Sequence, residues 1–319
     1  MDVSIIIVNW NSAEDVRKCL QSFRAHSSGL AYEVIVVDSG SFDGCDRMLA
    51  REFPEALYIQ SEKNIGFAKA NNLGARQARG EALWFLNPDT ELLEDSGPAL
   101  LVRLNSLPQA GAVGCRLLNS DRTLQTSCVQ SFPTVLNQVL DSEFLRARFP
   151  RSPLWGTAAF LAQPPRPEVV EAICGASILM KRSVFREING FAEDYFMYGE
   201  DIDLCYKVRQ AGYRVYYVPE TALIHHGGSS TQKAPSNFSH VMFQESVYRF
   251  LCRNRGRVSG AVFRLAMALS AVPRLLACLP LLLVSGNRIV RHGTGSLRKW
   301  ASVLRWSLGL ESWARTYGR

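Results

Sequence analysis

The eight cysteines of this 319-residue chain form no framework. None of them belongs to a C-x-x-C pair, and their positions show no regular spacing. This argues against a disulfide scaffold and against a cysteine-ligated metal cluster, so we expect reduced thiols in a cytosolic protein. Residues 1–10 carry no basic segment ahead of an apolar run, so the sequence predicts no secretory signal.

The chain also lacks a long hydrophobic run. Its longest stretch without a charged or polar side chain, Leu275–Val284, has ten residues, whereas a membrane-spanning helix needs about 20. The apolar segment 258–287 is interrupted by Arg264, Pro273, Arg274 and Pro280. This pattern favours interfacial or re-entrant helices at a membrane surface. The alternatives are a helical subdomain packed on the core and an oligomer interface.

Acidic residues are almost absent from the C-terminal segment. Residues 253–319 hold twelve Lys or Arg and one acid, Glu311, whereas residues 1–252 hold 24 basic and 28 acidic residues. The partner of the C-terminal segment is therefore expected to be anionic. Because its arginines alternate with leucines and prolines, this segment fits an anionic membrane surface better than nucleic acid.

Strands and helices alternate over the first ninety residues. The continuous apolar run at 3–10 is typical of a strand in a parallel sheet that is covered on both faces, and the segments 32–38, 56–60 and 82–89 are expected to form three further strands. A helical stripe of Val16, Leu20 and Phe23 follows the first run, and a helix is expected over 64–80. The pattern predicts an α/β fold, with a Rossmann-like, mostly parallel sheet flanked by helices.

Polar side chains stand at the ends of three of these expected strands. They are Asn9, Asn11, Asp38, Ser39, Asn87 and Asp89. Ligands of parallel sheets bind beyond the carboxyl ends of the strands, so these residues predict a ligand site. Ordinary turn residues are the alternative.

Three carboxylates lie within four residues further along the chain. Glu200, Asp201 and Asp203 follow Gly199 at the expected start of a helix. The helix dipole favours acids in the first turn by a few tenths of a kcal/mol each, so the cluster alone does not identify a catalytic site. Residues 111–130 are expected to form two strands of scaffold around a turn.

Six segments, taken in order, resemble the inverting family 2 nucleotide-sugar glycosyltransferases, which have the GT-A fold. They are SIIIVNWNS, VIVVDSGSFDG, NIGFAKANNLG, FLNPDT, the stretch from GASILMKR to VRQAGY, and HHGGSS. The resemblance covers roughly residues 1–240. It is greatest to the rhamnosyltransferase-like branch, which builds O-antigens and other cell-surface polysaccharides.

The resemblance implies a binding site for the nucleotide-sugar. Asp38 would contact the base or ribose, and Gly66 would allow a close approach of the backbone to the diphosphate. The implied residues are Asn9, Asn11, Asp38, Ser39, Asn64, Gly66, Asn71 and Asn87.

The resemblance also implies a divalent cation, Mg²⁺ or Mn²⁺, which would stabilise the charge on the leaving diphosphate. Asp89 stands where the family's D-x-D motif ends. His225 matches the histidine that completes the metal shell, and His226 is the alternative. Asn87 departs from the D-x-D pattern by offering a neutral carbonyl oxygen.

For the carboxylate cluster, the resemblance implies that Asp201 is the base that takes the proton from the acceptor hydroxyl. Glu200 would position the acceptor or brace the loop. Asp203 would cap or support the helix.

The sequence therefore predicts an inverting glycosyltransferase with two parts. Residues 1–252 would form the GT-A catalytic domain, with a nucleotide-binding half at 1–110 and an acceptor-binding, catalytic half at 111–252. Residues 253–319 would form a basic, helical, membrane-associating extension.

The donor expected from the rhamnosyltransferase-like branch is dTDP-rhamnose, with UDP- and GDP-sugars as alternatives. The expected acceptor is a lipid-linked glycan at the cytoplasmic face of the inner membrane.

Two other functions remain as alternatives. A sugar nucleotidyltransferase also has a Rossmann-like domain, but its first strand should lead into a phosphate loop rich in glycine, arginine and lysine, where this chain reads VNWNSAEDV. A membrane-bound scaffold without activity would be favoured by loss of the acid at position 89 or 201, and both acids are present.

Overall fold

The structure is a computed structural model that describes residues 1–142, 166–227, 237–283 and 287–317, with isolated residues at 145, 148, 149, 152 and 154. The chain divides into two compact units. The N-terminal unit comprises Met1–Phe132, Phe149–Phe196 and Glu200–Gln232. The helical unit comprises Pro133–Arg148, Met197–Gly199 and Lys233–Arg319.

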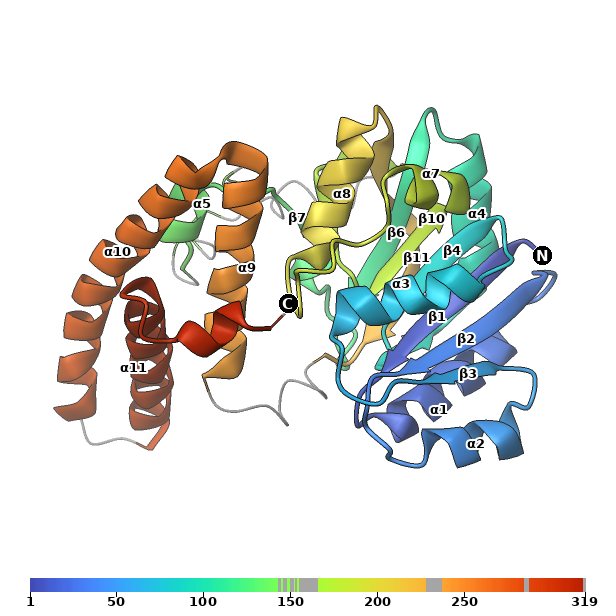
Figure 1. Cartoon of the computed structure of the whole chain (residues 1–319), viewed down its shortest axis with the longest axis horizontal. Coiled ribbons are helices and arrows are strands. Elements are labelled where there is room, and N and C mark those ends of the chain that lie inside the picture. Colours follow the sequence, from blue (N-terminus) through green and yellow to red (C-terminus); the bar gives the residue numbers. More distant parts are fainter. Residues whose placement is uncertain are drawn as a thin grey trace. The chain divides into compact units, whose positions relative to one another are not determined.

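A nine-stranded sheet forms the centre of the N-terminal unit, in the order β3-β2-β1-β4-β10-β6-β11-β5, with β8 paired to β11 (Figure 1). The strands are β1 (Val3–Asn9), β2 (Tyr32–Asp38), β3 (Leu57–Gln60), β4 (Ala82–Leu86), β5 (Thr90–Leu92), β6 (Ala110–Leu118), β8 (Glu168–Val170), β10 (Ser177–Lys181) and β11 (Arg214–His225). The pairings within β1–β4 and between β6 and β11 are parallel, whereas β5, β8 and β10 pair antiparallel. The expected mostly parallel sheet is confirmed.

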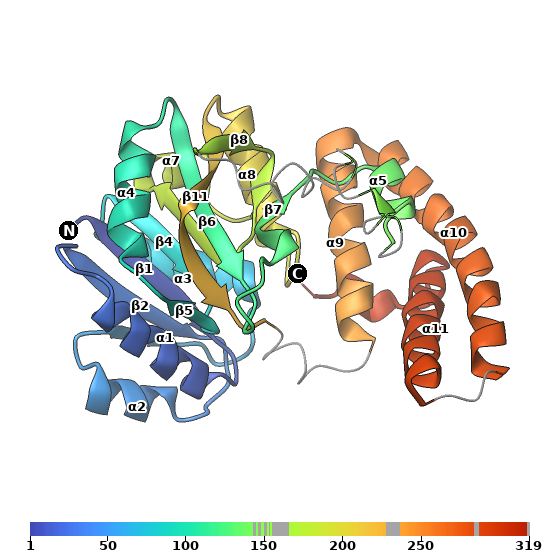
Figure 2. The same cartoon turned by 180° about the vertical axis from the view of Figure 1, so that it is seen from behind.

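Helices cover both faces of this sheet. Helices α3 (Phe67–Gln77), α7 (Arg182–Glu187) and α8 (Glu200–Gln210) lie on the face seen in Figure 1. Helices α1 (Ala13–Ala25), α2 (Cys45–Glu52) and α4 (Ser96–Ser106) lie on the face seen in Figure 2. The strand residues Ile5, Ile6 and Ile7 are all fully buried, because successive side chains of β1 point into opposite layers. The covered sheet explains why these strands read as continuous apolar runs.

The segment 111–130 was expected to form two strands, and the structure bears this out in part. After β6 and a turn, a short 3₁₀ helix (Thr126–Cys128) leads to β7 (Val129–Gln130), which pairs with β9 (Ala172–Ile173) in a separate two-stranded sheet. The segment therefore leaves the main sheet at its end and places Gln125 and Gln130 near other parts of the fold.

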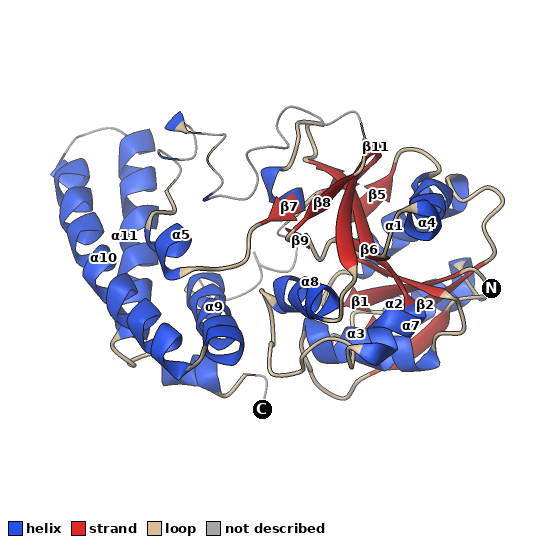
Figure 3. Cartoon of the chain, turned by 90° about the horizontal axis from the view of Figure 1, so that it is seen from above, coloured by secondary structure: helices blue, strands red, loops and turns tan. Residues whose placement is uncertain are grey.

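The helical unit consists of α5 (Val135–Val139), α9 (Phe238–Arg255), α10 (Arg257–Leu283), α11 (Asn287–Ser307) and a 3₁₀ helix (Ser312–Arg315) (Figure 3). The apolar segment 258–287 is interrupted in sequence by arginines and prolines, yet residues 258–283 lie in one helix, because α10 continues through Pro273 and Pro280. Its buried residues Phe263, Met267, Ala271 and Cys278 lie on one side of the helix, so packing within the unit compensates for the prolines. Among the described residues, α10 is the one helix that is long and apolar enough to cross a membrane by length and composition.

Candidate active site

Asn9 and Asp38 meet at the carboxyl ends of β1 and β2, where they are opposite each other in the sheet register. Asn9 Nδ2 donates to Asp38 Oδ2 at 2.7 Å, and Ser41 donates to Asp38 through its amide (2.7 Å) and its hydroxyl (2.6 Å). Burial alone would raise the pKa of Asp38, but these hydrogen bonds outweigh burial and lower it. Both side chains are fully buried, so they hold the turn at Ser41 and Asp43 in place.

Ser39 and Asn64 tie the start of α3 to the end of β2. The Ser39 hydroxyl donates to Asn64 Oδ1 at 3.1 Å, and the Asn64 Oδ1 atom also accepts from the amide of Gly66 at 2.9 Å. Gly66 has φ +80, and a Cβ atom there would lie 2.5 Å from the carbonyl oxygen of Phe196. The close approach that Gly66 allows in this structure is therefore to the loop ahead of the carboxylate cluster.

The remaining asparagines expected to bind nucleotide have different surroundings. Asn11 lies two residues after the end of β1 and adopts φ +54, a left-handed conformation that asparagine tolerates. Asn71 is buried within α3 and donates to the carbonyl of Phe67 at 3.0 Å. Its neighbour Asn72, which sequence reasoning missed, exchanges hydrogen bonds of 2.9 Å with the backbone of Phe191.

Asp89 and His225 are brought together by the pairing of β5 with β11. His225 is opposite Thr90 in this antiparallel ladder, and the amide of His226 donates to the carbonyl of Asp89 at 2.9 Å. As a result, His225 Nε2 lies 3.4 Å from Asp89 Oδ1. His226 points elsewhere, since its ring contacts Ser120 (2.8 Å) and Glu91 (3.3 Å).

The surroundings of this pair suit a hard divalent cation. His225 Nδ1 lies 2.8 Å from Gln125 Oε1, and an amide oxygen can only accept, so Nδ1 donates to it and Nε2 is the ring nitrogen that faces Asp89. Asn87 Oδ1 is buried without a hydrogen-bond partner beside them. Asn87 Nδ2 lies 3.4 Å from His225 Nε2, so the amide group of Asn87, with its unpaired oxygen, is next to the pair. A carboxylate oxygen and an imidazole nitrogen 3.4 Å apart, with this amide oxygen nearby, fit a shared cation. No group of three or more His, Cys, Asp and Glu in the described part of the chain is arranged to hold a metal, so further ligands would have to be other oxygens.

Glu200 and Asp201 begin helix α8 but have different surroundings. Asp201 Oδ2 accepts from the amide of Gly175 at 2.9 Å and from Gln130 Nε2 at 3.1 Å, and its Oδ1 accepts from the amide of Ile202 at 2.8 Å. Glu200 is 7% exposed, and its Oε2 has no hydrogen-bond partner. The protein therefore supplies N–H donors to both oxygens of Asp201 but leaves Glu200 Oε2 without one.

This difference decides where a shared proton resides. Burial, followed by the negative charge of Asp201, raises the pKa of Glu200. Burial also raises the pKa of Asp201, but the hydrogen bonds from Gly175, Ile202 and Gln130 oppose that rise. Because N–H donors favour the ionised form, the proton resides on Glu200 and the negative charge on Asp201. An ionised carboxylate beside a protonated one can act as a general base.

Asp203 belongs to the structural framework. It is fully buried, and the hydroxyl of Tyr195 donates to its Oδ1 at 3.3 Å. This contact fits the expectation that Asp203 supports the helix.

The supporting glutamines had no sequence signal. Gln125 and Gln130 lie in the segment expected to be scaffold, yet one contacts His225 and the other contacts Asp201. Gln125 is 100 positions from His225 along the chain, and Gln130 is 71 positions from Asp201. Only the folded structure therefore reveals these contacts.

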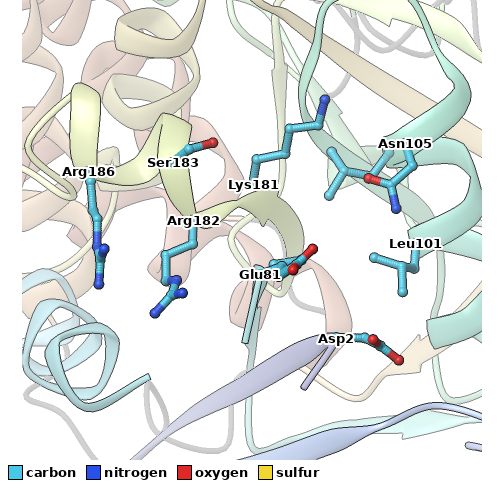
Figure 4. A pocket seen from close by; sticks show the side chains of 10 residues that line it. Asp2, Glu81, Leu101, Asn105, Lys181, Arg182, Ser183 and Arg186 are labelled. Carbon is cyan, nitrogen blue, oxygen red and sulfur yellow. The ribbon is translucent and has the colours of Figure 1, made fainter. Parts of the chain in front are cut away.

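A pocket of about 400 Å³ lies at the opposite ends of the central strands from Asn9 and Asp38 (Figure 4). It is lined by Asp2 ahead of β1, Glu81 ahead of β4 and Lys181 at the end of β10, together with Leu101, Asn105, Arg182, Ser183 and Arg186. These positions mark the amino ends of β1 and β4, whereas Asn9 and Asp38 mark carboxyl ends. Ligands of such sheets bind at the carboxyl ends, so we do not assign the reaction to this pocket.

Some known proteins resemble this chain in sequence, and others resemble it in fold. The model of glycosyl transferase family 2 matches residues 4–188, and a model described as the N-terminal domain of galactosyltransferase matches residues 158–227. The N-acetylglucosaminyl-diphospho-decaprenol L-rhamnosyltransferase of Mycobacterium tuberculosis is 31% identical over 68% of this chain and 74% of its own length. Rhamnosyltransferase WbbL of Escherichia coli is 28% identical over 79% of this chain and 94% of its own length.

Among solved structures, the mannosyltransferase PcManGT of Pyrobaculum calidifontis, in complex with GDP-Man and Mn²⁺, matches with a TM-score of 0.58. It shares 18% identity, over 97% of this chain and 87% of that one, and this level of identity shows a common fold. The sheet order, the helices on both faces and the family match over residues 4–188 lead to one conclusion: the chain is a glycosyltransferase that belongs to glycosyl transferase family 2 and has the GT-A fold.

Proposed function

We propose that this enzyme transfers a sugar, with inversion, from a nucleoside diphosphate to a hydroxyl group of a lipid-linked glycan. The names of two relatives supply the substrate class, because both are rhamnosyltransferases and one acts on a diphospho-decaprenol. The proposed donor is dTDP-rhamnose, with UDP- and GDP-sugars as the alternatives. The proposed product is part of a cell-surface polysaccharide such as an O-antigen.

The proposal rests above all on the unequal environments of Glu200 and Asp201. Inversion requires a base on the face of the sugar opposite the leaving group. Asp201 would take the proton from the acceptor hydroxyl, since Gly175 and Gln130 hold one of its oxygens and keep it ionised. Glu200, protonated and without a partner for Oε2, would donate a hydrogen bond to the acceptor and so position it.

Asp89 and His225 would bind a divalent cation, with the buried Oδ1 of Asn87 close by. Such an ion would stabilise the negative charge on the departing diphosphate. Carboxylate oxygens suit both Mg²⁺ and Mn²⁺, and a histidine ligand favours Mn²⁺. Gln125 would fix the orientation of the His225 ring.

The nucleotide would bind at the carboxyl ends of β1 and β2. Asn9, Asn11, Asp38, Ser39, Asn64, Gly66, Asn71 and Asn87 remain the proposed set. Because the side chains of Asn9 and Asp38 are fully buried, we propose that they act by holding the turn at Ser41 and Asp43, which would face the nucleotide. Residues 1–252 would carry the catalysis, divided between nucleotide-binding and acceptor-binding halves at residue 110.

Residues 253–319 would hold the enzyme at the cytoplasmic face of the inner membrane. One side of α10 exposes an apolar stripe at helical spacing of four and three residues, with each member 46–78% exposed. We call this the exposed stripe: Val258, Val262, Leu265, Leu269, Val272 and Leu276. Twelve basic residues and one acid in the same segment match an anionic lipid surface.

A donor panel tests the proposed reaction. Purified protein would be incubated with dTDP-, UDP- and GDP-sugars, Mg²⁺ or Mn²⁺, and membrane lipid extract, and release of the nucleoside diphosphate measured. We expect release from one donor that requires metal. Asp201→Asn should lower the rate by about 10²- to 10⁴-fold, the usual contribution of a general base.

Asp46→Asn is the matched control, because it makes the same chemical change at an exposed position of α2 and should retain the wild-type rate. Undiminished release by Asp201→Asn would place the base elsewhere. If no donor is turned over and no nucleotide binds, the chain is a scaffold and the proposed reaction is wrong.

A further inference from the structure

A pocket of about 210 Å³ lies within the helical unit, and none of its lining residues is among those proposed for catalysis. Side chains of α9, α10, α11 and the α5 region line it. None of these residues lies in the six segments that resemble family 2 glycosyltransferases. Its lining is Gln138, Asp141, His240, Phe243, Gln244, Met267, Lys299, Trp300 and Val303. We call it the helical-unit pocket. Ligand pockets for drug-sized molecules usually span about 300–1,000 Å³, so this one suits a single ring rather than a nucleotide-sugar.

A buried acceptor in the lining points to a ligand with hydroxyl or amide donors. Gln244 is 7% exposed, and its Oε1 has no hydrogen-bond partner. A buried oxygen left unpaired costs about 1–3 kcal/mol, so such an atom requires an explanation. A donor group on a bound ligand would satisfy it.

The charges of the lining favour a neutral ligand. Lys299 contributes one positive charge and Asp141 one negative charge, so the pair offers no net attraction for a phosphate. Burial, together with the charge of Lys299, lowers the pKa of His240, so its ring is neutral at pH 7. The polar side chains of the lining provide both hydrogen-bond donors and acceptors: the ammonium of Lys299, the imidazole of His240, the carboxylate of Asp141 and the amides of Gln138 and Gln244. The hydroxyl groups of a ligand can bond to either kind.

An aromatic surface completes the lining. Phe243 is 37% exposed and contributes to the wall, beside the apolar side chains of Met267 and Val303. The ring of Trp300 is already covered by the guanidinium of Arg274, which lies 4.3 Å from its centroid. Phe243 is therefore the aromatic face that could pack against the C–H side of a sugar ring.

We propose that the helical-unit pocket binds one sugar ring of the glycan acceptor. Gln244 accepts a hydrogen bond from the ring substituents, and Phe243 packs against the ring face. The identity of the sugar rests on the proposed function, whereas the existence of the site does not. N-acetylglucosamine is the natural probe, because it is the sugar named in the acceptor of the Mycobacterium tuberculosis relative.

Saturation-transfer NMR with methyl β-N-acetylglucosaminide measures this binding directly on the full chain. We expect Gln244→Leu and Phe243→Leu each to weaken binding of this probe at least tenfold. Gln210→Leu is the matched control, because Gln210 is exposed at the end of α8. Without ligand, Gln244→Leu should unfold at the same or a higher temperature than the wild type, since it removes an unpaired buried oxygen.

Kinetics separate this inference from the proposed function. Gln244→Leu should raise the KM for the glycan acceptor and leave the KM for the nucleotide-sugar unchanged. Probe binding that depends on Gln244 supports the site even if no donor is turned over. Probe binding equal in the wild type and both pocket variants, or an unchanged acceptor KM in an active enzyme, overturns it, as does binding of inorganic phosphate in place of the sugar.

Discussion

At the scale of single residues, the proposed chemistry depends on pairs of like groups placed in unlike environments. Glu200 and Asp201 are neighbours in sequence, yet only Asp201 has N–H donors on both of its oxygens. His225 and His226 are likewise adjacent, but only His225 faces Asp89. In each pair the chain supplies two candidate residues, and the surrounding hydrogen bonds select one.

The stability of the protein should reflect the raised pKa of Glu200. Its folded-state pKa, about 8, lies above the ordinary 4.5, so the folded protein binds this proton more tightly than the unfolded chain. The contribution of Glu200 to the free energy of unfolding is therefore present at low pH and lost as pH rises from about 4.5 towards 8. Glu200→Gln, which cannot ionise, should gain stability relative to the wild type over that interval.

Urea unfolding of both proteins at several pH values measures this difference. Glu62→Gln makes the same change at an exposed position and is the control: its stability relative to the wild type should not change with pH over this interval. A stability difference between Glu200→Gln and the wild type that shrinks as pH rises would contradict the placement of the proton.

Gln125 should matter for the metal without touching it. Its Oε1 accepts the Nδ1 proton of His225, and loss of such a support typically weakens metal binding by about 10- to 100-fold. Gln125→Leu should therefore raise the Kd for Mn²⁺ by that factor, measured by calorimetry with a nucleoside diphosphate present. His226→Ala should leave the Kd unchanged, because the ring of His226 contacts Ser120 and Glu91 instead.

At the scale of elements, the segments predicted most accurately were those with uniform surroundings. The runs at 3–10 and 32–38 became β1 and β2 to within one residue, because both are buried on two faces. The helix expected over 64–80 begins only at Phe67, since Ser39 and Asn64 hold residues 64–66 as a loop. Contacts distant in sequence set that boundary, and no local pattern contains them.

The packing of α3 on the sheet gives a prediction at this scale. A Cβ atom at Gly74 would lie 2.7 Å from Ile6 Cγ2 and 3.2 Å from Val37 Cγ2, and both of those side chains are fully buried. Alanine improves helix propensity by about 1 kcal/mol, whereas overpacking a core costs about 1–3 kcal/mol. We expect the crowding to prevail because both methyl groups belong to fully buried core side chains.

Gly74→Ala should therefore lower the melting temperature, as followed by circular dichroism. Gln77→Gly, at an exposed position of the same helix, serves as the comparison for helix propensity. A melting temperature for Gly74→Ala above that of the wild type would show that the helix moves to accommodate the methyl group.

At the scale of the whole molecule, charge and apolar surface are unevenly distributed along the chain. The segment 253–319 holds twelve of the 36 basic residues and one of the 29 acids, and it also carries the exposed stripe. These two properties in one segment favour contact with anionic lipid.

Vesicle sedimentation tests the membrane proposal. The protein should bind vesicles that contain phosphatidylglycerol and should bind weakly to phosphatidylcholine alone. Raising salt from 0.1 M to 1 M shortens the Debye length from about 10 Å to about 3 Å, so binding should weaken. Leu265→Gln combined with Leu269→Gln should reduce binding to these vesicles. Val102→Gln, at an exposed position of α4, is the control and should not reduce it. A concentration-dependent dimer lost in the same double variant would instead assign the exposed stripe to a second copy of the chain.

The sequence by itself determined the α/β class, the positions of the first strands along the chain and the residue types at their carboxyl ends. These features follow from burial on two faces and from the direction of parallel strands, which local patterns record. The tertiary structure alone decided the continuity of α10 through its prolines, the orientation of His225 towards Asp89 and of His226 towards Ser120, and the contacts of Gln125 and Gln130. Each of these depends on side chains far apart in sequence, and their contacts exist only once the chain has folded.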